Sequence, residues 1–491
     1  MFDLRAWLVR RRDPLVVGAV GLFARLAVVA WAASRIPAAA DGVYYDKVAT
    51  RIAAGEGYTW LWPDGVVTYA AHYPVGYPAL VGAGYAVFGA HPVVAMLLNA
   101  LLGAAAAVAT WALVSDLSKA RSASSTALGP AAALFAGLVV ALHPALVPYT
   151  PAIMTEAPTA ALLVIAGACA TRSWRIATGL VIGAAVLVRP QSLVFAPVLG
   201  ALMARVAAPG TGASHAAWWR APLVGAAMTT AIALGVCLPW TARNCVRMEK
   251  CALVSVNGGW NLAIGTQTED GAWREIQVPP ECREVFQEAA KDECFGAAAR
   301  RAILADPVRW VAHMPAKLHA TFDYFGAAPW YLHTANSDAF SYDAKIRLAK
   351  VETLVSRLLL LAALIGMART AKRRGRLLLA VVALGGLACF TVQAWPAYVL
   401  LGMLALARRR GPLLYPYAGA VIVGTALTHA VFFGAGRYGL VVVPFVSALA
   451  LAQPPLQAHA WLRRRRTGDR RSPSATVERE ESPSSTERDA G

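Results

Sequence analysis

Apolar stretches long enough to cross a membrane alternate with short polar turns along most of the chain. The apolar core of a bilayer is about 30 Å thick, so a crossing helix needs roughly 20 apolar residues. A helix satisfies its own backbone hydrogen bonds inside lipid, and the pattern therefore predicts an all-α polytopic membrane protein with about 12 transmembrane helices. The expected spans are 15–34, 92–115, 128–147, 153–171, 175–189, 191–206, 221–240, 351–368, 377–394, 396–407, 413–433 and 438–455.

Two long polar segments, 35–91 and 241–350, interrupt this pattern, and counting the spans places both on the outer face of the membrane. Within the first, the apolar stretch 78–88 is too short to cross, at about 11 residues, and predicts a juxtamembrane or re-entrant helix. The predicted organisation is a cytoplasmic N-terminus (1–14), a transmembrane module (15–240) that contains the first outer loop (35–91), an outer segment (241–350), C-terminal transmembrane helices (351–455) and a disordered cytoplasmic tail (456–491).

Composition and charge agree with this topology. Hydrophobic residues make up 57% of the 491 residues and charged residues only 15%, far from the balance of a soluble domain. The excess of 46 basic over 28 acidic residues lies in clusters that all fall on one side if the first is cytoplasmic, as positive-inside bias requires. The net charge of +18 is therefore expected to reflect topology, and no nucleic-acid partner is expected. The clusters are Arg10–Arg12, Lys119 with Arg121, Arg172 with Arg175, Arg205 with Arg220, Lys372–Arg374 with Arg376, Arg408–Arg410 and Arg463–Arg466.

The N-terminus allows two interpretations. Basic residues, an apolar stretch and Ala38–Ala40 resemble a signal peptide, whose cleavage would leave Asp41 as the first residue. The length of the apolar stretch, the presence of Arg25 within it and the count of later spans favour a retained first helix. A charge in mid-span is costly, so we expect Arg25 to face the bundle interior, with either a structural or a substrate partner.

An aspartate, Asp41, stands directly outside the first span. Turn signals at 55–58 and 63–65, and a short hairpin through 66–69, fold the loop back and bring Asp41 close to 72–78. A carboxylate at the mouth of a helical bundle, with aromatic residues behind it, suggests chemistry on a membrane-borne substrate.

Charged residues at the outer ends of other spans converge on the same face: Glu156, Arg189, Arg243 and Arg437. Positive charge is disfavoured on this side, and a guanidinium fork matches the oxygens of a lipid phosphate. The alternative for each arginine is a side chain that snorkels to the interface or pairs with a carboxylate. For the outer tyrosines the alternative is an interfacial aromatic belt.

Six short patterns follow one another from about residue 15 to residue 455. They are Asp41, Tyr45, Ala49, Ile52, Gly55, Gly57 and Tyr58; Tyr73–Pro78; Met154–Glu156; Gly183 with Val188–Pro190; Leu238–Asn244 with Ser255–Leu262; and Arg437–Tyr438. In this order they resemble the bacterial GT-C glycosyltransferases, in particular the protein O-mannosyltransferase-like and lipid A aminoarabinose transferase-like enzymes. The resemblance implies a GT-C-type bundle and transfer of a sugar from a polyprenyl-phosphate donor. It places the acceptor, an envelope lipid, glycan or protein, on the periplasmic face of a bacterial inner membrane.

The resemblance also implies residue roles. Asp41 would be the catalytic base, because inverting displacement at an anomeric carbon needs a carboxylate to orient or deprotonate the acceptor. Glu156 would be a second carboxylate that orients the acceptor or holds a divalent cation. Cations stabilise the departing donor phosphate, a role for Arg189, Arg243 and Arg437. Weaker candidates for the phosphate are Lys47 and Arg51, and candidate substrate contacts are Tyr45, Arg51, His72, Tyr73, Tyr77 and Asn257.

Two features depart from the family pattern. Relatives often carry a second acid close behind the first, whereas here Gly42 follows Asp41 and the nearest acid is Asp46. On a helix Asp46 falls off the face of Asp41, so we expect a structural or interfacial charge. The return segment has His72 where relatives often have a double proline, and His72 could carry a proton or bind a metal, although a lone histidine in a loop usually does neither. Metal dependence stays open, since no close cluster of His, Cys and Asp appears.

Four of the seven cysteines lie in the outer segment, and in an oxidising compartment they predict two disulfides. The local pairing of Cys245 with Cys251 and of Cys282 with Cys294 is favoured among three connectivities, with zinc binding as the alternative. The chain has no glycine-rich phosphate loop, so neither a nucleotide cofactor nor a nucleotide-sugar donor is expected.

Two other functions fit a bundle with basic cytoplasmic turns. A transporter or flippase of lipid-linked sugars should have polar or broken helices near the midplane, whereas the acidic residues here gather at the outer ends. An O-antigen ligase or polymerase also uses lipid-linked sugars outside, but such enzymes rely on outer arginines and histidines and lack an acid equivalent to Asp41.

Overall fold

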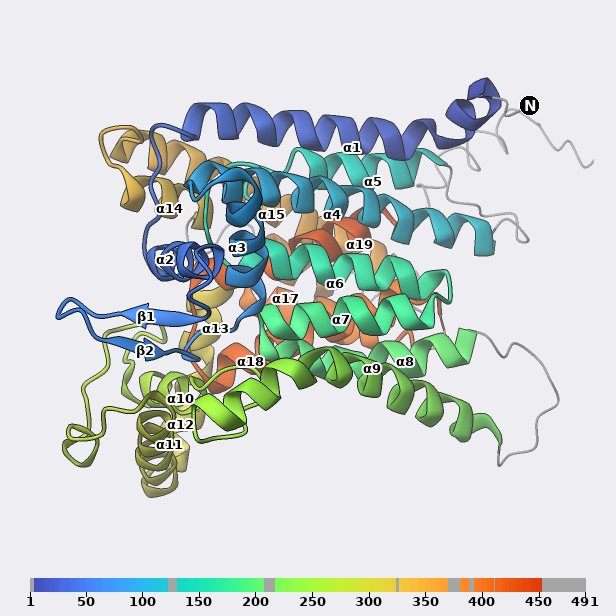
Figure 1. The fold of residues 1–491 in the computed structure, drawn as a ribbon. Coiled ribbons are helices and arrows are strands. Elements are labelled where there is room, and N and C mark those ends of the chain that lie inside the picture. Colours follow the sequence, from blue (N-terminus) through green and yellow to red (C-terminus); the bar gives the residue numbers. More distant parts are fainter. Residues whose placement is uncertain are drawn as a thin grey trace, which may run out of the picture. The chain divides into compact units, whose positions relative to one another are not determined.

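The computed structural model describes residues 4–121, 130–206, 217–323, 326–369, 380–387, 393–409 and 411–452, so the predicted tail lies outside the described residues. Long helices lie side by side, and the smaller elements gather at one end of this bundle (Figure 1). The bundle contains α1 (Leu4–Ala32), α4 (Pro92–Arg121), α5 (Pro130–Ala141), α6 (Glu156–Thr171), α7 (Arg175–Val188), the 3₁₀ turn η1 (Pro190–Val194), α8 (Phe195–Val206), α9 (Ala217–Arg247), α15 (Tyr342–Arg369), α17 (Trp395–Leu406), α18 (Leu414–Val431), the 3₁₀ turn η3 (Gly436–Val442) and α19 (Val443–Leu451). The smaller elements are α2 (Asp41–Ala53), β1 (Thr59–Leu61), β2 (Val67–Tyr69), α3 (Gly76–Phe88), α10 (Gly258–Gln267), η2 (Pro280–Cys282), α11 (Glu288–Ala305), α12 (Pro307–Ala312), α13 (Met314–Phe322) and α14 (Ala327–Ala335).

Five helices of the described part are long and apolar enough to cross a membrane: α1, α4, α9, α15 and α18. Five shorter apolar helical stretches accompany them, in α5, α6, α7, α17 and η3–α19. The chain is thus built as a multi-pass membrane protein, but the predicted number of spans is not confirmed. Of the predicted span 377–394, only 380–387 and 393–394 lie within the described residues.

Several predicted spans are shorter or less regular than expected. The chain is not helical over 142–155, because three prolines in this stretch cannot supply a backbone N–H to a helix. The predictions of continuous helices over 128–147 and 153–171 were therefore too long. The predicted spans 191–206 and 438–455 likewise begin as the 3₁₀ turns η1 and η3 and continue as α-helices.

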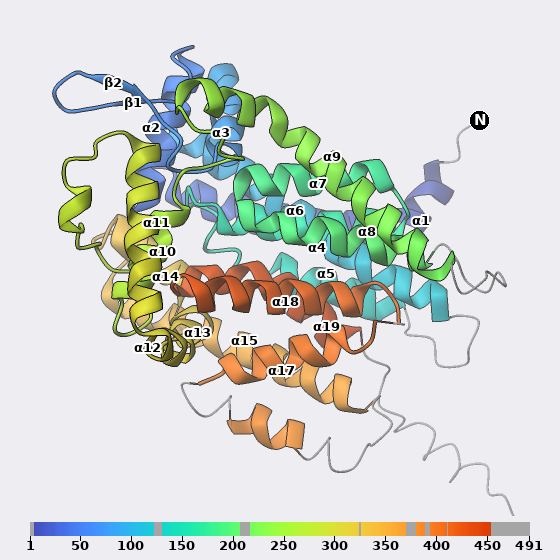
Figure 2. The ribbon, with the colours of Figure 1, turned by 90° about the horizontal axis from the view of Figure 1, so that it is seen from below.

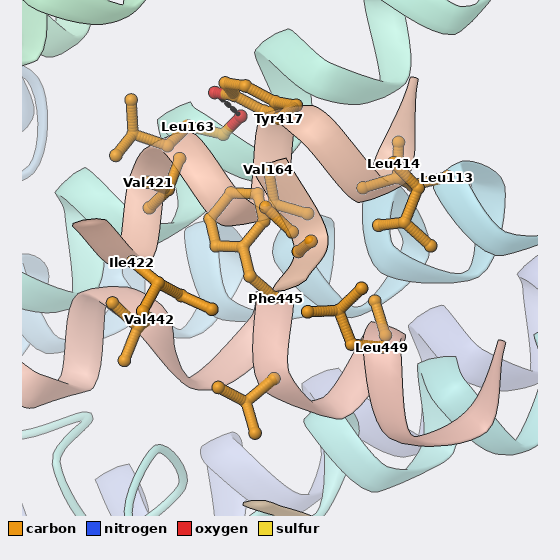
Figure 3. Packing of buried hydrophobic residues seen from close by; sticks show 14 of the residues in the cluster. Leu113, Leu163, Val164, Leu414, Tyr417, Val421, Ile422, Val442, Phe445 and Leu449 are labelled. Atoms are coloured by element: carbon orange, nitrogen blue, oxygen red, sulfur yellow. Dashed lines mark hydrogen bonds between the residues drawn. The ribbon is translucent and has the colours of Figure 1, made fainter. Parts of the chain in front are cut away.

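A core of buried side chains joins the C-terminal helices to the N-terminal ones (Figure 3). α18 and α19 lie between the N-terminal helices and the pair α15 and α17 (Figure 2). The rings of Tyr417 in α18 and Phe445 in α19 meet edge to face, with centroids 5.4 Å apart. The Tyr417 hydroxyl donates a hydrogen bond of 2.8 Å to the carbonyl of Leu163 in α6. This packing holds η3, between α18 and α19, against α6.

The first outer loop is fixed to the bundle through α3. A Cβ on Gly76 would lie 2.6 Å from the backbone of Leu187, so only glycine allows α3 to approach the end of α7 this closely. α2 packs on α3, and β1 pairs with β2 in an antiparallel hairpin. The predicted short helix over 78–88 is found in α3, and the predicted hairpin through 66–69 is found in β1 and β2.

Arg25 has a structural role inside the bundle, where it is 2% exposed. Its Nη1 donates to the carbonyls of Gly21 and Ala141, at 3.0 and 2.9 Å, and its Nη2 donates to that of Val140 at 3.3 Å. Ala141 and Val140 end α5, where carbonyls have no partner within the helix. Arg25 therefore satisfies free carbonyls at the end of α5. Of the two kinds of partner considered for Arg25, structural or substrate, this is the structural one.

Candidate active site

A cavity of about 390 Å³ lies where the first outer loop, the turn between α7 and α8, the outer segment and η3 meet. Its size is near the lower end of the range for ligand sites, about 300–1,000 Å³. Its walls combine three charged side chains with amides, hydroxyls and aromatic rings. The lining residues are Asp41, Tyr45, His72, Tyr73, Pro74, Thr155, Val188, Arg189, Pro190, Gln191, Ser255, Asn257, Gly258, Trp260, Asn261, Ile264, Trp273, Thr428, His429, Phe432, Phe433, Arg437 and Tyr438.

Four charged side chains form one network beside this cavity. Arg437 Nη2 lies 2.7 Å from Asp41 Oδ2, and Arg437 Nε lies 3.3 Å from Glu156 Oε1. Arg189 Nη2 lies 2.6 Å from the same Glu156 oxygen. The other Glu156 oxygen accepts a hydrogen bond of 3.1 Å from the Tyr149 hydroxyl. One buried carboxylate therefore holds two guanidinium groups, and one of these also reaches Asp41.

Element boundaries bring these charges together. Asp41 opens α2 and Glu156 opens α6, and a helix N-terminus favours a carboxylate because its free N–H groups carry partial positive charge. Arg189 follows the last residue of α7, in extended backbone, because Pro190 disfavours helical geometry before it. Arg437 lies in η3. The site is thus assembled from two helix starts, one helix end and one 3₁₀ turn.

Hydroxyl groups complete the network on the cavity side. The Tyr73 hydroxyl donates to Asp41 Oδ1 at 3.0 Å, and Arg189 Nε donates to Thr155 Oγ1 at 2.9 Å. Burial and the neighbouring Asp41 raise the pKa of Tyr73, so its phenol stays protonated at neutral pH and remains a donor. Each oxygen of Asp41 therefore has a partner in the protein: Oδ1 accepts from the Tyr73 hydroxyl and Oδ2 pairs with Arg437.

The two carboxylates differ in access. The side chain of Asp41 is 28% exposed and lines the cavity, whereas that of Glu156 is 1% exposed and lies behind the arginines. The prediction that Glu156 itself orients an acceptor or holds a cation is therefore corrected: in this geometry it positions Arg189 and Arg437. Within the described residues, no three His, Cys, Asp or Glu side chains are grouped so that they could hold a metal ion.

Four candidate substrate contacts lie in the cavity wall: Tyr45, His72, Tyr73 and Asn257. Burial lowers the pKa of His72 to about 4, although nearby Asp41 opposes this shift, so the imidazole is neutral near pH 7. A neutral His72 can accept or donate a hydrogen bond but adds no charge to the cavity.

Arg243 lies outside the cavity, which corrects its predicted place among the phosphate ligands. Its Nη1 donates to the Ala70 carbonyl and its Nη2 to the Tyr58 carbonyl, both at 2.8 Å. The guanidinium also lies over the Trp240 ring, 4.6 Å from its centroid. Arg243 therefore holds the first outer loop onto the end of α9.

Two further candidates also lie outside the cavity. Arg51 Nη1 pairs with Glu56 Oε2 at 2.7 Å within the first outer loop. The Tyr77 hydroxyl donates to Asn99 Oδ1 at 3.1 Å in the bundle interior. Both side chains are used by the protein, so they are not placed to contact a substrate in this cavity.

Several cavity residues were not expected from the sequence. His429, near the end of α18, stacks on Tyr438 with ring centroids 4.2 Å apart, and its Nδ1 lies 2.9 Å from the Phe433 carbonyl oxygen. Trp260 and Trp273 come from the outer segment. A lone histidine in an apolar span has no spacing signal. Trp260 lies within the pattern Ser255–Leu262, and this pattern could have indicated a place at the site.

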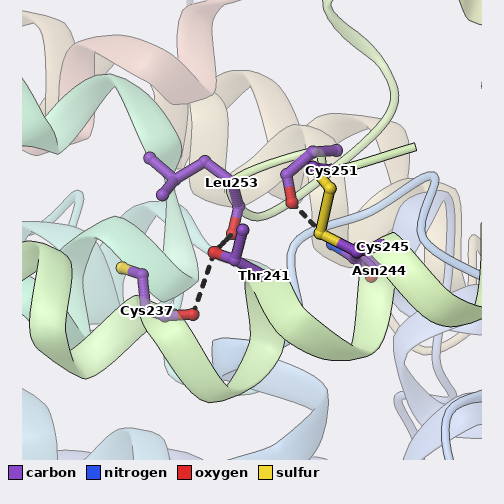
Figure 4. Close-up of a disulfide and its surroundings, with 7 residues drawn as sticks. Cys237, Thr241, Asn244, Cys245, Cys251 and Leu253 are labelled. Carbon is purple, nitrogen blue, oxygen red and sulfur yellow. Dashed lines mark hydrogen bonds between the residues drawn. A yellow bond between two sulfur atoms is a disulfide. The ribbon is translucent and has the colours of Figure 1, made fainter.

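Two disulfides brace the outer segment: Cys245–Cys251 and Cys282–Cys294. This is the local pairing favoured from the sequence. The first joins the end of α9 to the stretch that leads into the cavity wall, beside hydrogen bonds between the same two parts (Figure 4). The wall residues 255–261 are thus tethered to a long bundle helix.

No protein-family model and no curated protein matches the chain. Similar solved structures include the oligosaccharyltransferase AglB of Archaeoglobus fulgidus with an inhibitory peptide and a dolichol-phosphate (16% identity, 92% of this chain, 50% of that chain, TM-score 0.43). An oligosaccharyltransferase of Archaeoglobus fulgidus in the apo form is similar at 13% identity (90% of this chain, 49% of that chain, TM-score 0.44). ArnT of Cupriavidus metallidurans with undecaprenyl phosphate is similar at 16% identity (91% of this chain, 78% of that chain, TM-score 0.37). The chain thus spans about half the length of these archaeal oligosaccharyltransferase chains. At these TM-scores the likenesses assign no residue role and no substrate to this chain.

Proposed function

We propose that the protein is a membrane glycosyltransferase that moves a sugar from a polyprenyl-phosphate donor to an acceptor in the cell envelope. One observation carries the proposal: the carboxylate of Asp41 and the guanidinium groups of Arg189 and Arg437 line one cavity at the end of an apolar helical bundle. Guanidinium groups bind phosphate, and a carboxylate can accept a proton from a hydroxyl. The sequence resemblance to GT-C enzymes supports this class of donor. The acceptor is an envelope lipid, glycan or protein.

The charge distribution supports a site on the outer face. Arg172 and Arg175 lie at the turn between α6 and α7, at the end of the bundle away from the smaller elements (Figure 1). Positive-inside bias favours a cytoplasmic position for such a turn. The cavity would then face the periplasm of a bacterial inner membrane, a compartment in which the two disulfides of the outer segment can form.

In the proposed reaction, an acceptor hydroxyl attacks the anomeric carbon of the donor from the face opposite the phosphate. The bond between this carbon and the phosphate oxygen breaks, the electron pair leaves with the polyprenyl phosphate, and Asp41 takes the hydroxyl proton. Arg189 and Arg437 stabilise the charge on the departing phosphate. Since Arg437 also pairs with Asp41, the donor phosphate competes for this arginine and frees a carboxylate oxygen for the acceptor. The anomeric centre is inverted.

The change Asp41→Asn tests this function. Purified protein in lipid nanodiscs is supplied with a radiolabelled polyprenyl-phosphate sugar, and release of the sugar from the lipid is measured. We expect kcat to fall by about 10²–10⁴-fold, because an amide cannot take the proton.

Asp46→Asn is the matched control. Asp46 lies on the same helix, accepts a hydrogen bond of 2.5 Å from the Tyr85 hydroxyl and does not line the cavity, so its variant should turn over within about threefold of the unaltered protein. Full turnover by Asp41→Asn would refute the role of Asp41 as base. Lack of turnover by the unaltered protein with every polyprenyl-phosphate sugar would refute the donor class.

A further inference from the structure

The charged groups of the cavity are few, and the proposed reaction uses all of them. The described lining contains one aspartate, Asp41, and two arginines, Arg189 and Arg437, and no glutamate or lysine. The lowered pKa of His72 keeps its ring neutral at physiological pH. If the two arginines hold the donor phosphate and Asp41 meets the acceptor, no charged side chain of the described lining remains for the sugar ring.

The rest of the wall offers neutral hydrogen-bonding groups. Gln191 comes from η1, and Asn257 and Asn261 come from the start of α10, with all three lining the cavity. A side-chain amide has both an acceptor oxygen and donor N–H groups, which match a hydroxyl that also donates and accepts. The Ser255 hydroxyl donates to Asn257 Oδ1 at 2.9 Å, which fixes the orientation of that amide.

Aromatic rings form another part of the wall. Trp260 is held edge to face against Phe295 and His72, with ring centroids 4.7 and 5.1 Å away. Trp273 lines the cavity while remaining 59% exposed, so its ring is accessible. The Trp273 backbone N–H donates to the Gly434 carbonyl at 3.2 Å, which ties it to the loop before η3. An accessible indole face suits the C–H face of a sugar ring.

A charged sugar fits this wall poorly. The ammonium of an amino sugar needs a carboxylate, and the carboxylate of a uronic acid needs a further guanidinium or ammonium group. A charge that leaves water without such a partner loses its hydration and gains little in return. A hydroxyl, in contrast, needs only neutral donors and acceptors, which the side-chain amides of the wall supply.

We propose that the transferred sugar is neutral, carrying neither a free amino group nor a carboxylate, and that Gln191, Asn257, Asn261 and Trp273 select it. This inference rests on the proposed function and narrows its substrate class. The amides bind the ring hydroxyls, the indole packs on the ring face, and the absence of a further charge in the described lining rejects charged sugars.

Three donors on the same polyprenyl phosphate test the proposal: a neutral hexose, a 4-amino-4-deoxy pentose and a uronic acid. We expect kcat/KM for the neutral hexose to exceed that for either charged sugar by at least about tenfold. Turnover of a charged sugar as fast as or faster than the hexose, with loss of turnover in Asp41→Asn, would overturn this inference and leave the proposed function standing. Lack of turnover with all three donors would overturn both.

A change of one wall residue tests the selection directly. Asn257→Asp places a carboxylate in the wall, and it should shift the ratio of kcat/KM between the amino sugar and the hexose by about tenfold toward the amino sugar. Gln277→Glu, which adds the same charge to an exposed position outside the cavity, should leave the ratio unchanged. Thermal unfolding shows that each variant is folded.

Trp273→Ala tests the aromatic part of the wall, and we expect a severalfold rise in KM for the hexose donor that Trp273→Phe reverses. An unchanged sugar ratio in a folded Asn257→Asp variant, or an unchanged KM in Trp273→Ala, would refute the assignment of that residue.

Discussion

Two carboxylates of the described structure, Asp323 and Asp41, are satisfied in different ways. Asp323, at the end of α13, has a side chain with no exposed surface. Its oxygens accept hydrogen bonds from Arg357 Nη2 at 3.0 Å and from the backbone N–H groups of Ala394 and Trp395, and His319 Nδ1 lies 3.1 Å away. These contacts join α13, α15 and the start of α17. Asp323 is therefore saturated by the protein.

Asp41 receives a hydrogen bond from Tyr73 and forms an ion pair with Arg437, and its side chain lines the cavity and is 28% exposed. Arg437 is shared between two carboxylates, so an incoming anion can compete for it. A saturated carboxylate holds elements together, while a partly satisfied one beside a cavity can exchange partners. The contrast predicts loss of stability at the first and loss of activity at the second.

Asp323→Asn should have the largest effect on stability. The change removes the negative charge of a buried ion pair with Arg357 and keeps only a neutral amide, and loss of one partner of a buried pair costs about 3–5 kcal/mol. Thermal unfolding in detergent measures the loss. Asp41→Asn, which breaks a partly exposed pair, should cost less than about 1 kcal/mol. Equal unfolding temperatures for the two variants would break the distinction between them.

Arg437→Gln tests the cavity side of the contrast. The change removes the cation that joins Asp41 to Glu156 and that would face the donor phosphate, so we expect kcat/KM to fall by about 10²–10³-fold. Arg437→Lys should restore only part of the loss, because an ammonium keeps the charge but not the fork of donors. Sugar release from the labelled donor is the measurement. Complete restoration by lysine would show that charge alone matters here.

The sequence predicted which charged residues line the cavity better than it predicted the contacts between them. Asp41, Arg189 and Arg437 were recognisable because a charge at the outer end of an apolar span is conspicuous, and they meet in one cavity. The sequence could not show that Glu156 lies behind the arginines, because side-chain depth depends on how helices from distant parts of the chain pack. The extent of individual helices was predicted less well, since prolines convert parts of apolar stretches into turns whose course hydropathy does not reveal.

The misplacement of Arg243 has the same physical origin. An arginine can satisfy its N–H groups with phosphate or with backbone carbonyls, and only the fold shows that the carbonyls of Ala70 and Tyr58 lie within 2.8 Å. The wall residues Trp273 and His429 were unpredictable for a related reason. Neither stands in a spacing that marks a site, and each reaches the cavity through tertiary packing.

Arg243→Gln should therefore have a smaller effect than Arg437→Gln. The change loses two charged hydrogen bonds that hold the first outer loop, which carries Asp41 and Tyr73, and we expect kcat to fall by about tenfold with little change in donor KM. Arg247→Gln, on the same helix, is the comparison: its exposed guanidinium contacts the same loop through the Tyr69 ring, 4.5 Å from the ring centroid, and the change should lower activity less than Arg243→Gln. If Arg243→Gln instead raised only the KM for the donor and left kcat unchanged, this arginine would bind the donor phosphate after all.

His72→Gln should have the smallest effect near neutral pH, and its effect should appear in acid. Burial lowers the pKa of His72 from 6.5 to about 4, so between these values the unfolded chain binds a proton that the folded chain does not. The free energy of unfolding therefore falls as the pH drops through this window, and His72→Gln should make that fall shallower. Activity at pH 7–8 should change by less than about threefold, because the imidazole is already neutral there. Unfolding temperatures of the two proteins from pH 7 to pH 4.5 provide the measurement. An equally steep fall in both proteins would mean that the cavity wall around His72 opens to water. This part of the wall would then be accessible like Asp41, and not closed like Asp323.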